Sequence, residues 1–220
     1  MLNNLIQYED DNNMNNKKTM TSIIALSALI VTFAMPSAFA SETPIESYYW
    51  QTNPETCYLE TELDDIDFNG SRSTSNQADI ISELEVTRST YNTEMGTIDI
   101  LGEDSGSCSD TRRIEVGAFD FGNWWTYGQE STASSGTTML RSFIDFNTNW
   151  LVGFDKDSEA CNRLDVDMEW IYNHELGHGI GLKHHSHVFG TADTLMGSSC
   201  SSQWDSFGAD DHGAVDQHYP

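Results

Sequence analysis

Residues 174–184 read His-Glu-Leu-Gly-His-Gly-Ile-Gly-Leu-Lys-His. Residues four apart lie on the same face of an α-helix, so a helix here presents the imidazoles of His174 and His178 to one point. Gly181 can take the left-handed conformation that ends a helix, which costs more for a residue with a Cβ atom. The chain can then turn back so that His184 supplies a third nitrogen. The stretch therefore predicts a three-histidine metal site.

The expected metal is Zn²⁺, with Glu175 as the catalytic residue. Three protein ligands leave a fourth position open for water, which is the catalytic form of a zinc site. Glu175 adjoins a ligand without needing to bind the metal, and its carboxylate can take a proton from the zinc-bound water. The alternative is that the two helical histidines are ordinary surface residues. Five specified positions within eleven residues favour the metal site.

The order H-E-x-x-H-x-x-G-x-x-H resembles the zinc motif of the metzincins, a clan of zinc peptidases. Metzincins also have a downstream Met-turn, with a methionine beneath the zinc site, and Met196 follows His184 by twelve residues. The resemblance implies an α+β fold with a twisted mixed sheet, a zinc-binding helix, the Met-turn and a C-terminal helix. It also gives Gly181 and Met196 structural roles at the site.

Within the clan, the chain is most similar to matrixin-like catalytic domains, the matrix metalloproteinase type. Residues 178–184 resemble the matrixin H-x-L-G-L-x-H, and residues 210–219 resemble the D-D-I-x-G-I-Q-x-L-Y that closes those domains. The chain departs from the pattern at His185, where matrixins have Ser. Astacins and serralysins place Tyr at the position of Ser198, so a tyrosine ligand is not expected there.

By this resemblance the chain is a zinc metalloendopeptidase, which hydrolyses protein or peptide substrates through a zinc-bound water and Glu175 as general base. Residues 197–204 would form a wall of the specificity pocket, and a strand at 138–146 would pair with an extended substrate. One alternative is a secreted zinc-containing peptide-binding protein without turnover. Another is a toxin or adhesin fragment in which the zinc fold is only a scaffold. The glutamate favours the enzyme, because pure binding needs no general base.

The first 40 residues have the pattern of a cleaved signal peptide. Residues 21–40 are apolar, follow Lys17-Lys18 and end in Ala38-Phe39-Ala40, an A-x-A cleavage sequence. A transmembrane anchor is the alternative, which Pro36 and the small final residues disfavour. We therefore expect a secreted or periplasmic protein without stable membrane insertion after cleavage.

The mature chain is expected to begin at Ser41. Residues 1–13 are polar and include three acidic side chains, which does not suit the basic start of a signal peptide. Met14 is followed by two asparagines and two lysines, a more usual beginning. Met14 is thus the favoured true start.

The composition is strongly acidic. The whole chain has 35 acidic and 10 basic side chains, of which three and two lie in residues 1–40, so the mature part has 32 acidic and 8 basic ones. The resulting formal charge of −24 repels nucleic acid and anionic membranes, so neither is an expected partner. Acidic loops could hold a structural Ca²⁺ ion, although no EF-hand or other ordered calcium loop occurs. A monomer is expected.

The cysteines predict two disulfides, because the chain has an even number of them and carries an export signal. Of the three possible pairings, we favour Cys57–Cys108 together with Cys161–Cys200. A competing interpretation makes one thiolate a zinc ligand in a latent form. Matrixin propeptides use a P-R-C-G-x-P-D segment for this purpose, and residues 53–58 do not match it.

Residue patterns divide the mature chain in two. Residues 41–76 are polar and turn-rich, so we expect an irregular N-terminal arm or a short prosegment. Residues 77–220 are expected to form the catalytic domain. Within it, the patterns predict helices at 77–95, from near 164 through the zinc motif, and from Asp210 or Asp211; strands at 97–101, 113–119 and 138–146; and loops at 102–110 and 122–136.

Overall fold

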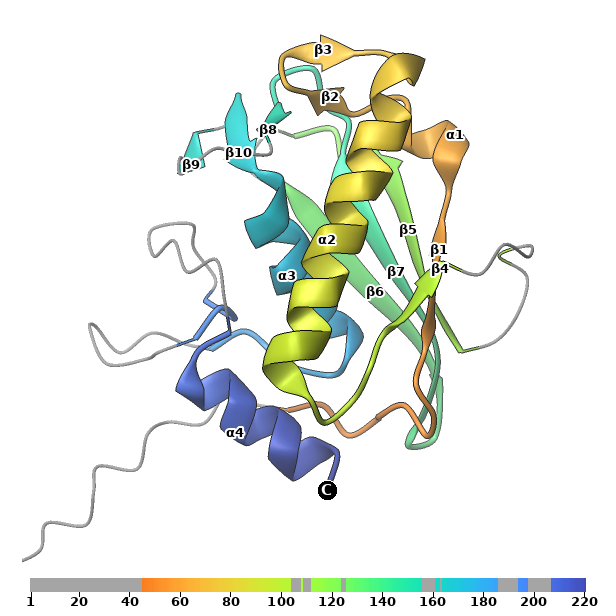
Figure 1. Cartoon of the computed structure of the whole chain (residues 1–220), viewed down its shortest axis with the longest axis vertical. Coiled ribbons are helices and arrows are strands. Elements are labelled where there is room, and N and C mark those ends of the chain that lie inside the picture. Colours follow the sequence, from red (N-terminus) through yellow and green to blue (C-terminus); the bar gives the residue numbers. More distant parts are fainter. Residues whose placement is uncertain are drawn as a thin grey trace, which may run out of the picture. The chain divides into compact units, whose positions relative to one another are not determined.

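The computed structural model describes residues 45–103, 108, 112–123, 126–155, 161–162, 164–185, 194–197 and 207–220 (Figure 1). The expected signal peptide, start site and mature N-terminus fall before residue 45, outside the described residues. Within the described ranges, no helix combines the length and apolar character that crossing a membrane requires.

The described chain combines helices with a mixed sheet and ends in a helix, so the α+β class is confirmed. In chain order the elements are β1 (Glu55–Tyr58), α1 (Glu60–Leu63), β2 (Asp67–Phe68), β3 (Ser71–Arg72), a 3-10 turn (Thr74–Asn76), α2 (Gln77–Met95), β4 (Leu101–Glu103), β5 (Arg113–Phe119), β6 (Gly128–Ser135), β7 (Thr138–Asn147), β8 (Phe154–Asp155), β9 (Cys161–Asn162), β10 (Asp165–Asp167), α3 (Met168–Gly179) and α4 (Ala209–His218).

The main sheet has five strands in the order β4-β1-β5-β7-β6. Neighbouring strands from β4 to β7 run parallel, whereas β6 runs antiparallel to β7 and forms one edge. Figure 1 shows α2 and α3 side by side in front of this sheet, and α3 contacts both β6 and β7. The predicted zinc motif therefore lies on a helix that packs against the edge of the sheet.

The hydrophobic core lies between the main sheet and these two helices. Val116 of β5, Ile144 of β7, Leu84 and Tyr91 of α2, and Leu176 of α3 are all fully buried. Complete burial of side chains of this size stabilises a fold by about 1.5–3 kcal/mol each. The core thus fixes the zinc-motif helix against both the sheet and α2.

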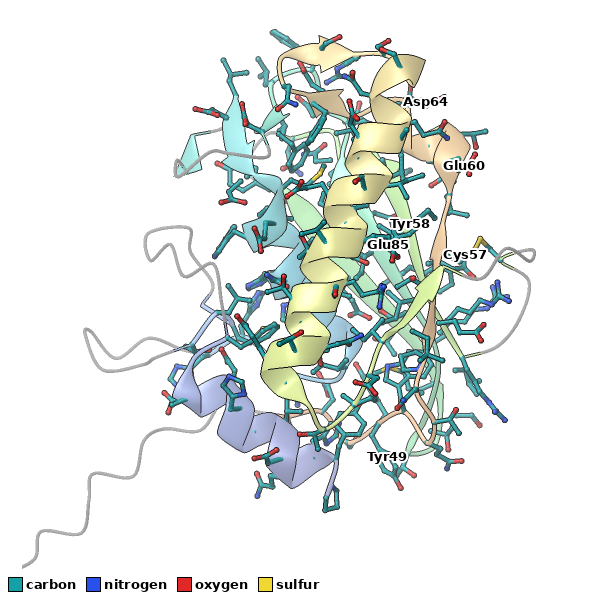
Figure 2. All side chains as sticks on the ribbon, in the orientation of Figure 1. Tyr49, Cys57, Tyr58, Glu60, Asp64 and Glu85 are labelled. Atoms are coloured by element: carbon teal, nitrogen blue, oxygen red, sulfur yellow. A yellow bond between two sulfur atoms is a disulfide. The ribbon has the colours of Figure 1, made fainter. Side chains whose placement is uncertain are left out.

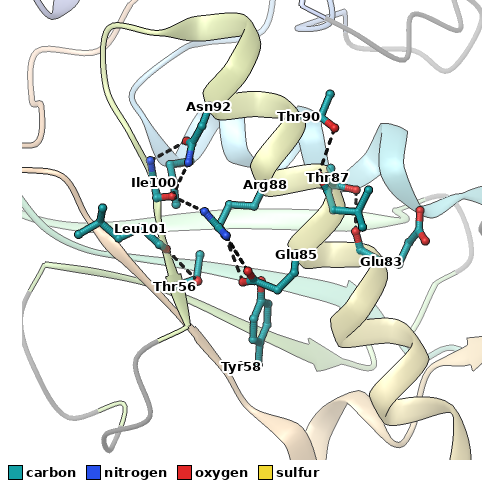
Figure 3. A network of polar contacts seen from close by, with 11 residues as sticks. Thr56, Tyr58, Glu83, Glu85, Thr87, Arg88, Thr90, Asn92, Ile100 and Leu101 are labelled. Atoms are coloured by element: carbon teal, nitrogen blue, oxygen red, sulfur yellow. Dashed lines mark hydrogen bonds and ion pairs between the residues drawn. The ribbon is translucent and has the colours of Figure 1, made fainter.

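A partly buried polar network connects α2 with β1 and with Ile100, the residue before β4 (Figure 3). The Tyr58 hydroxyl donates to Glu85 Oε1 at 2.7 Å, and Arg88 forms an ion pair with Glu85 Oε2 at 2.6 Å. Arg88 Nη1 also donates to the Ile100 carbonyl at 2.7 Å. Each polar group of this contact has a partner, which offsets the cost of removing it from water.

The edge strand β6 lies where the sequence predicts a loop. Residues 122–136 are predicted as a loop, but Gly128–Ser135 form eight residues of strand paired with β7. The prediction fails because β6 is built from small and polar residues and has no apolar alternation. Backbone pairing with β7, which sequence composition does not encode, makes it a strand.

The strand predicted at 138–146 is confirmed as β7, but its expected role is wrong. β7 pairs with β5 along one edge and β6 along the other, so it has no backbone edge for an extended substrate. The unpaired edge of the sheet on this side belongs to β6.

The predicted irregular arm at 41–76 also contains regular structure. Its residues 55–58 form β1, which lies between β4 and β5 in the main sheet. Cys57 of β1 forms the predicted disulfide with Cys108. The second predicted pair, Cys161–Cys200, involves side chains outside the described part of the chain.

A second small sheet has the strand order β3-β2-β8-β10-β9, and its strand β10 directly precedes α3 in the chain. β10 ends at Asp167, whose carboxylate accepts the Trp170 backbone N–H at 3.0 Å. This is a helix N-cap, so α3 begins at Met168 and not near Leu164 as predicted.

The remaining element limits agree with prediction for α2 and nearly so for α4, but not for β4. α2 has the predicted bounds and ends at Gly96 in the left-handed conformation, with φ +62°. The strand predicted from residue 97 begins only at Leu101, and α4 begins one residue before Asp210.

Candidate metal centre

The geometry of the site depends on where and how α3 ends. Its last residues carry His174 and His178 one turn apart, and the helix stops at Gly179. Gly181 follows with φ +99°, a conformation that side chains with a Cβ rarely adopt. A Cβ there would also lie 2.6 Å from His218 Nε2 and 3.2 Å from the Tyr48 carbonyl. Glycine is required at this turn for both conformation and space.

The turn brings three imidazoles together. His174 Nε2 and His178 Nε2 each lie 3.1 Å from His184 Nε2. The three candidate ligand atoms all lie within 4.8 Å of one another. Two nitrogens bound tetrahedrally to one Zn²⁺ at about 2.0–2.1 Å would be about 3.3 Å apart. The three predicted ligands are therefore positioned to bind a metal ion.

Backbone carbonyls fix the tautomers of two of these histidines. His174 Nδ1 lies 2.9 Å from the Leu195 carbonyl, and His178 Nδ1 lies 2.7 Å from the Leu182 carbonyl. A carbonyl only accepts, so each Nδ1 carries the proton and each Nε2 presents a lone pair. His184 Nε2 has at most one proton to share between them. A metal cation among the three nitrogens would accept all of their lone pairs. The residues present therefore fit a metal ion.

The electrostatics keep these imidazoles neutral. The pKa of His174 is lowered to about 3 and that of His178 to about 4, chiefly by burial, with a smaller contribution from the neighbouring histidines and against the opposing effect of the backbone hydrogen bonds. Burial also lowers the pKa of His184. Neutral imidazole is the form that binds metals.

Glu175 lies buried between α3 and the edge strand β6. A Cβ on Gly128 would lie 3.1 Å from Glu175 Cγ and Oε1, which shows how closely the strand approaches. Burial, followed by the nearby Glu130 carboxylate, raises the pKa of Glu175 to about 8, while the Glu130 backbone N–H opposes the rise. A metal ion held by the histidines would favour the ionised form, since opposite charge lowers a carboxyl pKa.

Met196 packs directly beneath the helix that carries the histidines. It is fully buried, and its Sδ occupies the space beside Gly177, between His174 and His178 in the sequence of α3. The His185 backbone N–H donates to the Met196 carbonyl at 2.7 Å. His185 is 3% exposed and follows the predicted ligand His184 directly in the chain, so it lies next to the site.

Asp211 of α4 holds the segment that contains Met196. Its carboxylate accepts hydrogen bonds from the Thr194 hydroxyl, from the Leu195 N–H at 2.6 Å and from the Gly208 N–H at 3.1 Å. Because the Leu195 carbonyl is also the partner of His174, α4 supports a metal ligand indirectly. The sequence indicates Asp211 only as part of the matrixin-like tail, so this role was not predicted.

A pocket of about 250 Å³ adjoins the histidines. It is lined by Glu46, Tyr48, Glu130, His178, Leu182, Lys183 and His184. Glu46 and Tyr48 come from the segment expected to be an irregular arm, and Glu130 from the segment expected to be a loop. No local spacing links these residues with the zinc motif, so the sequence carries no signal that would have grouped them.

The remaining predicted features are only partly described. Residues 198–204 of the expected pocket wall lie outside the described ranges. Among the residues that the structure describes, the three histidines are the one group of His, Cys, Asp and Glu with metal-binding geometry, so the calcium site stays a prediction. No family model matches the chain, and no curated protein matches it. The case for function therefore rests on the geometry of the three histidines, Glu175 and β6.

Proposed function

We propose that the protein is a secreted zinc-dependent metalloendopeptidase with a matrixin-like metzincin fold. The observation that carries the proposal is the convergence of three Nε2 atoms, two of them with tautomers fixed by backbone carbonyls. A buried glutamate follows the first of these histidines in the chain. Met196 beneath the helix and α4 after it agree with the metzincin arrangement.

His174, His178 and His184 would hold the zinc ion, leaving one coordination position open. A bound zinc ion lowers the pKa of a coordinated water to about 7 and polarises a carbonyl group. These two effects are what the hydrolysis of a peptide bond requires at neutral pH.

Glu175 supplies the acid–base chemistry. Its carboxylate accepts a proton from the attacking water and passes that proton to the leaving amine. The Glu130 backbone N–H, which donates to this carboxylate, holds it between α3 and β6. Burial of Glu175 favours proton transfer at neutral pH, because it brings the pKa of the side chain towards that range.

The edge strand β6 is the surface that we assign to the substrate backbone. Its outer edge has no strand partner in the described sheet, and it passes directly beside Glu175. An extended peptide can add to such an edge by backbone hydrogen bonds. This assignment replaces the predicted pairing of substrate with β7.

The test uses hydrolysis of casein and of a mixed peptide library by the purified protein, with and without a chelator. Glu175→Gln is expected to keep one zinc per chain and to lower hydrolysis by about 10²–10⁴-fold, because it removes the general base and leaves the ligands. His178→Ala is expected to lose zinc as well. His212→Ala, which removes a histidine of α4 outside the site, is the control and should keep both.

Two results would overturn the proposal. One is full hydrolysis by Glu175→Gln, which would remove the proposed base. The other is zinc binding by the native protein with no cleavage of any library peptide, which would leave a zinc-containing peptide-binding protein.

A further inference from the structure

The third histidine is held differently from the other two. His174 and His178 are each oriented by an Nδ1 hydrogen bond to a backbone carbonyl, but within the described ranges His184 Nδ1 has no such partner. The His184 residue is also exposed, so packing does not fix its ring. Its position therefore depends on the backbone that leads to it.

That backbone is the turn 179–182 between the end of α3 and His184. The last carbonyls of a helix have no partners within it. Here three consecutive carbonyls accept hydrogen bonds from distant parts of the chain. The Trp50 indole N–H donates to Gly179 O at 2.8 Å, the Tyr219 hydroxyl donates to Ile180 O at 2.7 Å, and the Glu46 backbone N–H donates to Gly181 O at 2.7 Å.

The donors are connected with one another. The Trp50 backbone N–H donates to the Tyr219 hydroxyl oxygen at 3.3 Å, so this hydroxyl joins the N-terminal segment to the turn. His218 Nε2 lies 2.9 Å from the Tyr48 carbonyl, and Ile45 forms a bridge with Leu182. Trp50 is only 3% exposed. These contacts link the two ends of the described chain across the turn.

We propose that residues 45–50 together with Tyr219 form a clamp that positions His184 as the third metal ligand. Trp50 and Tyr219 are its positioning residues, because their polar groups hold the carbonyls nearest the helix end. On this account residues 45–50 are a permanent part of the metal centre, and their removal weakens metal binding. A removable prosegment would have the opposite effect. The inference rests on the metal centre of the proposed function but does not depend on which reaction occurs there.

The test measures zinc affinity by competition with a chelator and the visible absorption spectrum of the Co²⁺-substituted protein. Tyr219→Phe removes one hydroxyl and keeps the ring, and Trp50→Phe removes the indole N–H. Loss of groups that orient metal ligands typically weakens metal binding by about 10- to 100-fold, and we expect a loss of this size in the double variant. The Co²⁺ spectrum should change as well, because the ligand geometry changes.

Thr97→Val is the matched control. It also removes a hydroxyl that contacts α4, since Thr97 Oγ1 donates to Asp216 Oδ1 at 2.7 Å, but this contact does not involve the turn. Its zinc affinity and Co²⁺ spectrum should equal those of the native protein. A second measurement uses a variant that begins at Gln51. It should bind zinc weakly and gain no hydrolytic activity.

Unchanged zinc affinity and an unchanged Co²⁺ spectrum in the folded double variant would overturn the clamp, even if thermal stability fell, because a purely structural role would have that result. A gain of activity on removal of residues 45–50 would overturn it too, in favour of a prosegment. The zinc affinity and the Co²⁺ spectrum of the double variant do not require peptide cleavage. Failure of the clamp is thus distinguishable from failure of the proposed peptidase.

Discussion

Gly177 lies on α3 between the two helical ligands and has an unusual neighbour. Glycine inside a helix is less favourable than alanine by about 0.5–1 kcal/mol, so a helix interior normally gains from its replacement. At this position a Cβ would collide with Met196 Sδ and lie 3.3 Å from the Phe207 ring. The missing side chain lets Met196 approach the helix backbone.

We therefore expect Gly177→Ala to destabilise the protein by about 1–3 kcal/mol, the usual cost of overpacking. Gly213→Ala in α4 is the control, because nothing lies within 4 Å of its Cβ position, and it should stabilise by about 0.5–1 kcal/mol. Urea denaturation of the metal-free proteins measures both. Adding Met196→Ala should recover part of the loss at Gly177. Equal effects of the two glycine substitutions would contradict the close approach.

At the residue scale, the sequence predicted those site residues that lie within one local motif. His174, His178 and His184 could be predicted because helix periodicity and one glycine bring them together. Trp50 and Tyr219 could not, since they reach the turn from 129 and 39 residues away. Every residue has a backbone carbonyl that can accept a hydrogen bond, so the accepting positions show no residue pattern. The hydrogen bonds that support the site could therefore not be predicted.

At the scale of elements, the Glu85 side chain forms a polar contact between α2 and β1 of the main sheet. Figure 2 shows Tyr58 and Glu85 directed toward each other between β1 and α2. The Glu85 carboxylate accepts from Tyr58 and is paired with Arg88. Burial raises the pKa of Tyr58, with the neighbouring Tyr172 as the next contribution. The Tyr58 hydroxyl therefore stays protonated and remains a donor to Glu85.

Replacing Arg88 by Met leaves the Glu85 carboxylate without its cation and removes the donor to Ile100. Breaking a fully buried pair costs about 3–5 kcal/mol, and these side chains are partly exposed, so we expect a loss of about 1–3 kcal/mol. Thermal or urea unfolding measures it. The double variant with Glu85→Gln should recover part of the loss, because no charge is then left unpaired. A double variant less stable than Arg88→Met alone would contradict this account.

Elements were predictable where apolar spacing defines them. The helix at 77–95 was predicted with correct ends, because buried residues recur along it and Gly96 closes it. β6 was missed because its side chains are polar and its pairing with β7 makes it a strand. The start of α3 was misplaced because β10 intervenes, and pairing of so short a strand depends on residues far away in sequence.

For the whole molecule, the Cys57–Cys108 disulfide connects β1 to the segment between β4 and β5 across 51 residues of sequence. Closing a loop of this length restricts the unfolded chain, and removing such a bond typically costs about 2–4 kcal/mol. We expect Cys57→Ala/Cys108→Ala to lose about this much stability in chemical denaturation. Treatment of the native protein with a reductant should have a similar effect. No change in the denaturation midpoint would show that the bond does not contribute to stability.

The hydrogen bond from Tyr219 to the turn before His184 has a consequence for the order of events in a newly made chain. Ribosomes synthesise the zinc motif and Met196 well before Tyr219, so an unfinished chain carries all three histidines without the last donor of the clamp. If the clamp positions His184, the chain binds zinc at full affinity only after α4 has been synthesised and Tyr219 has reached the turn. If the protein is the peptidase that we propose, its activity would then begin only after synthesis, and the position of one tyrosine would set this delay.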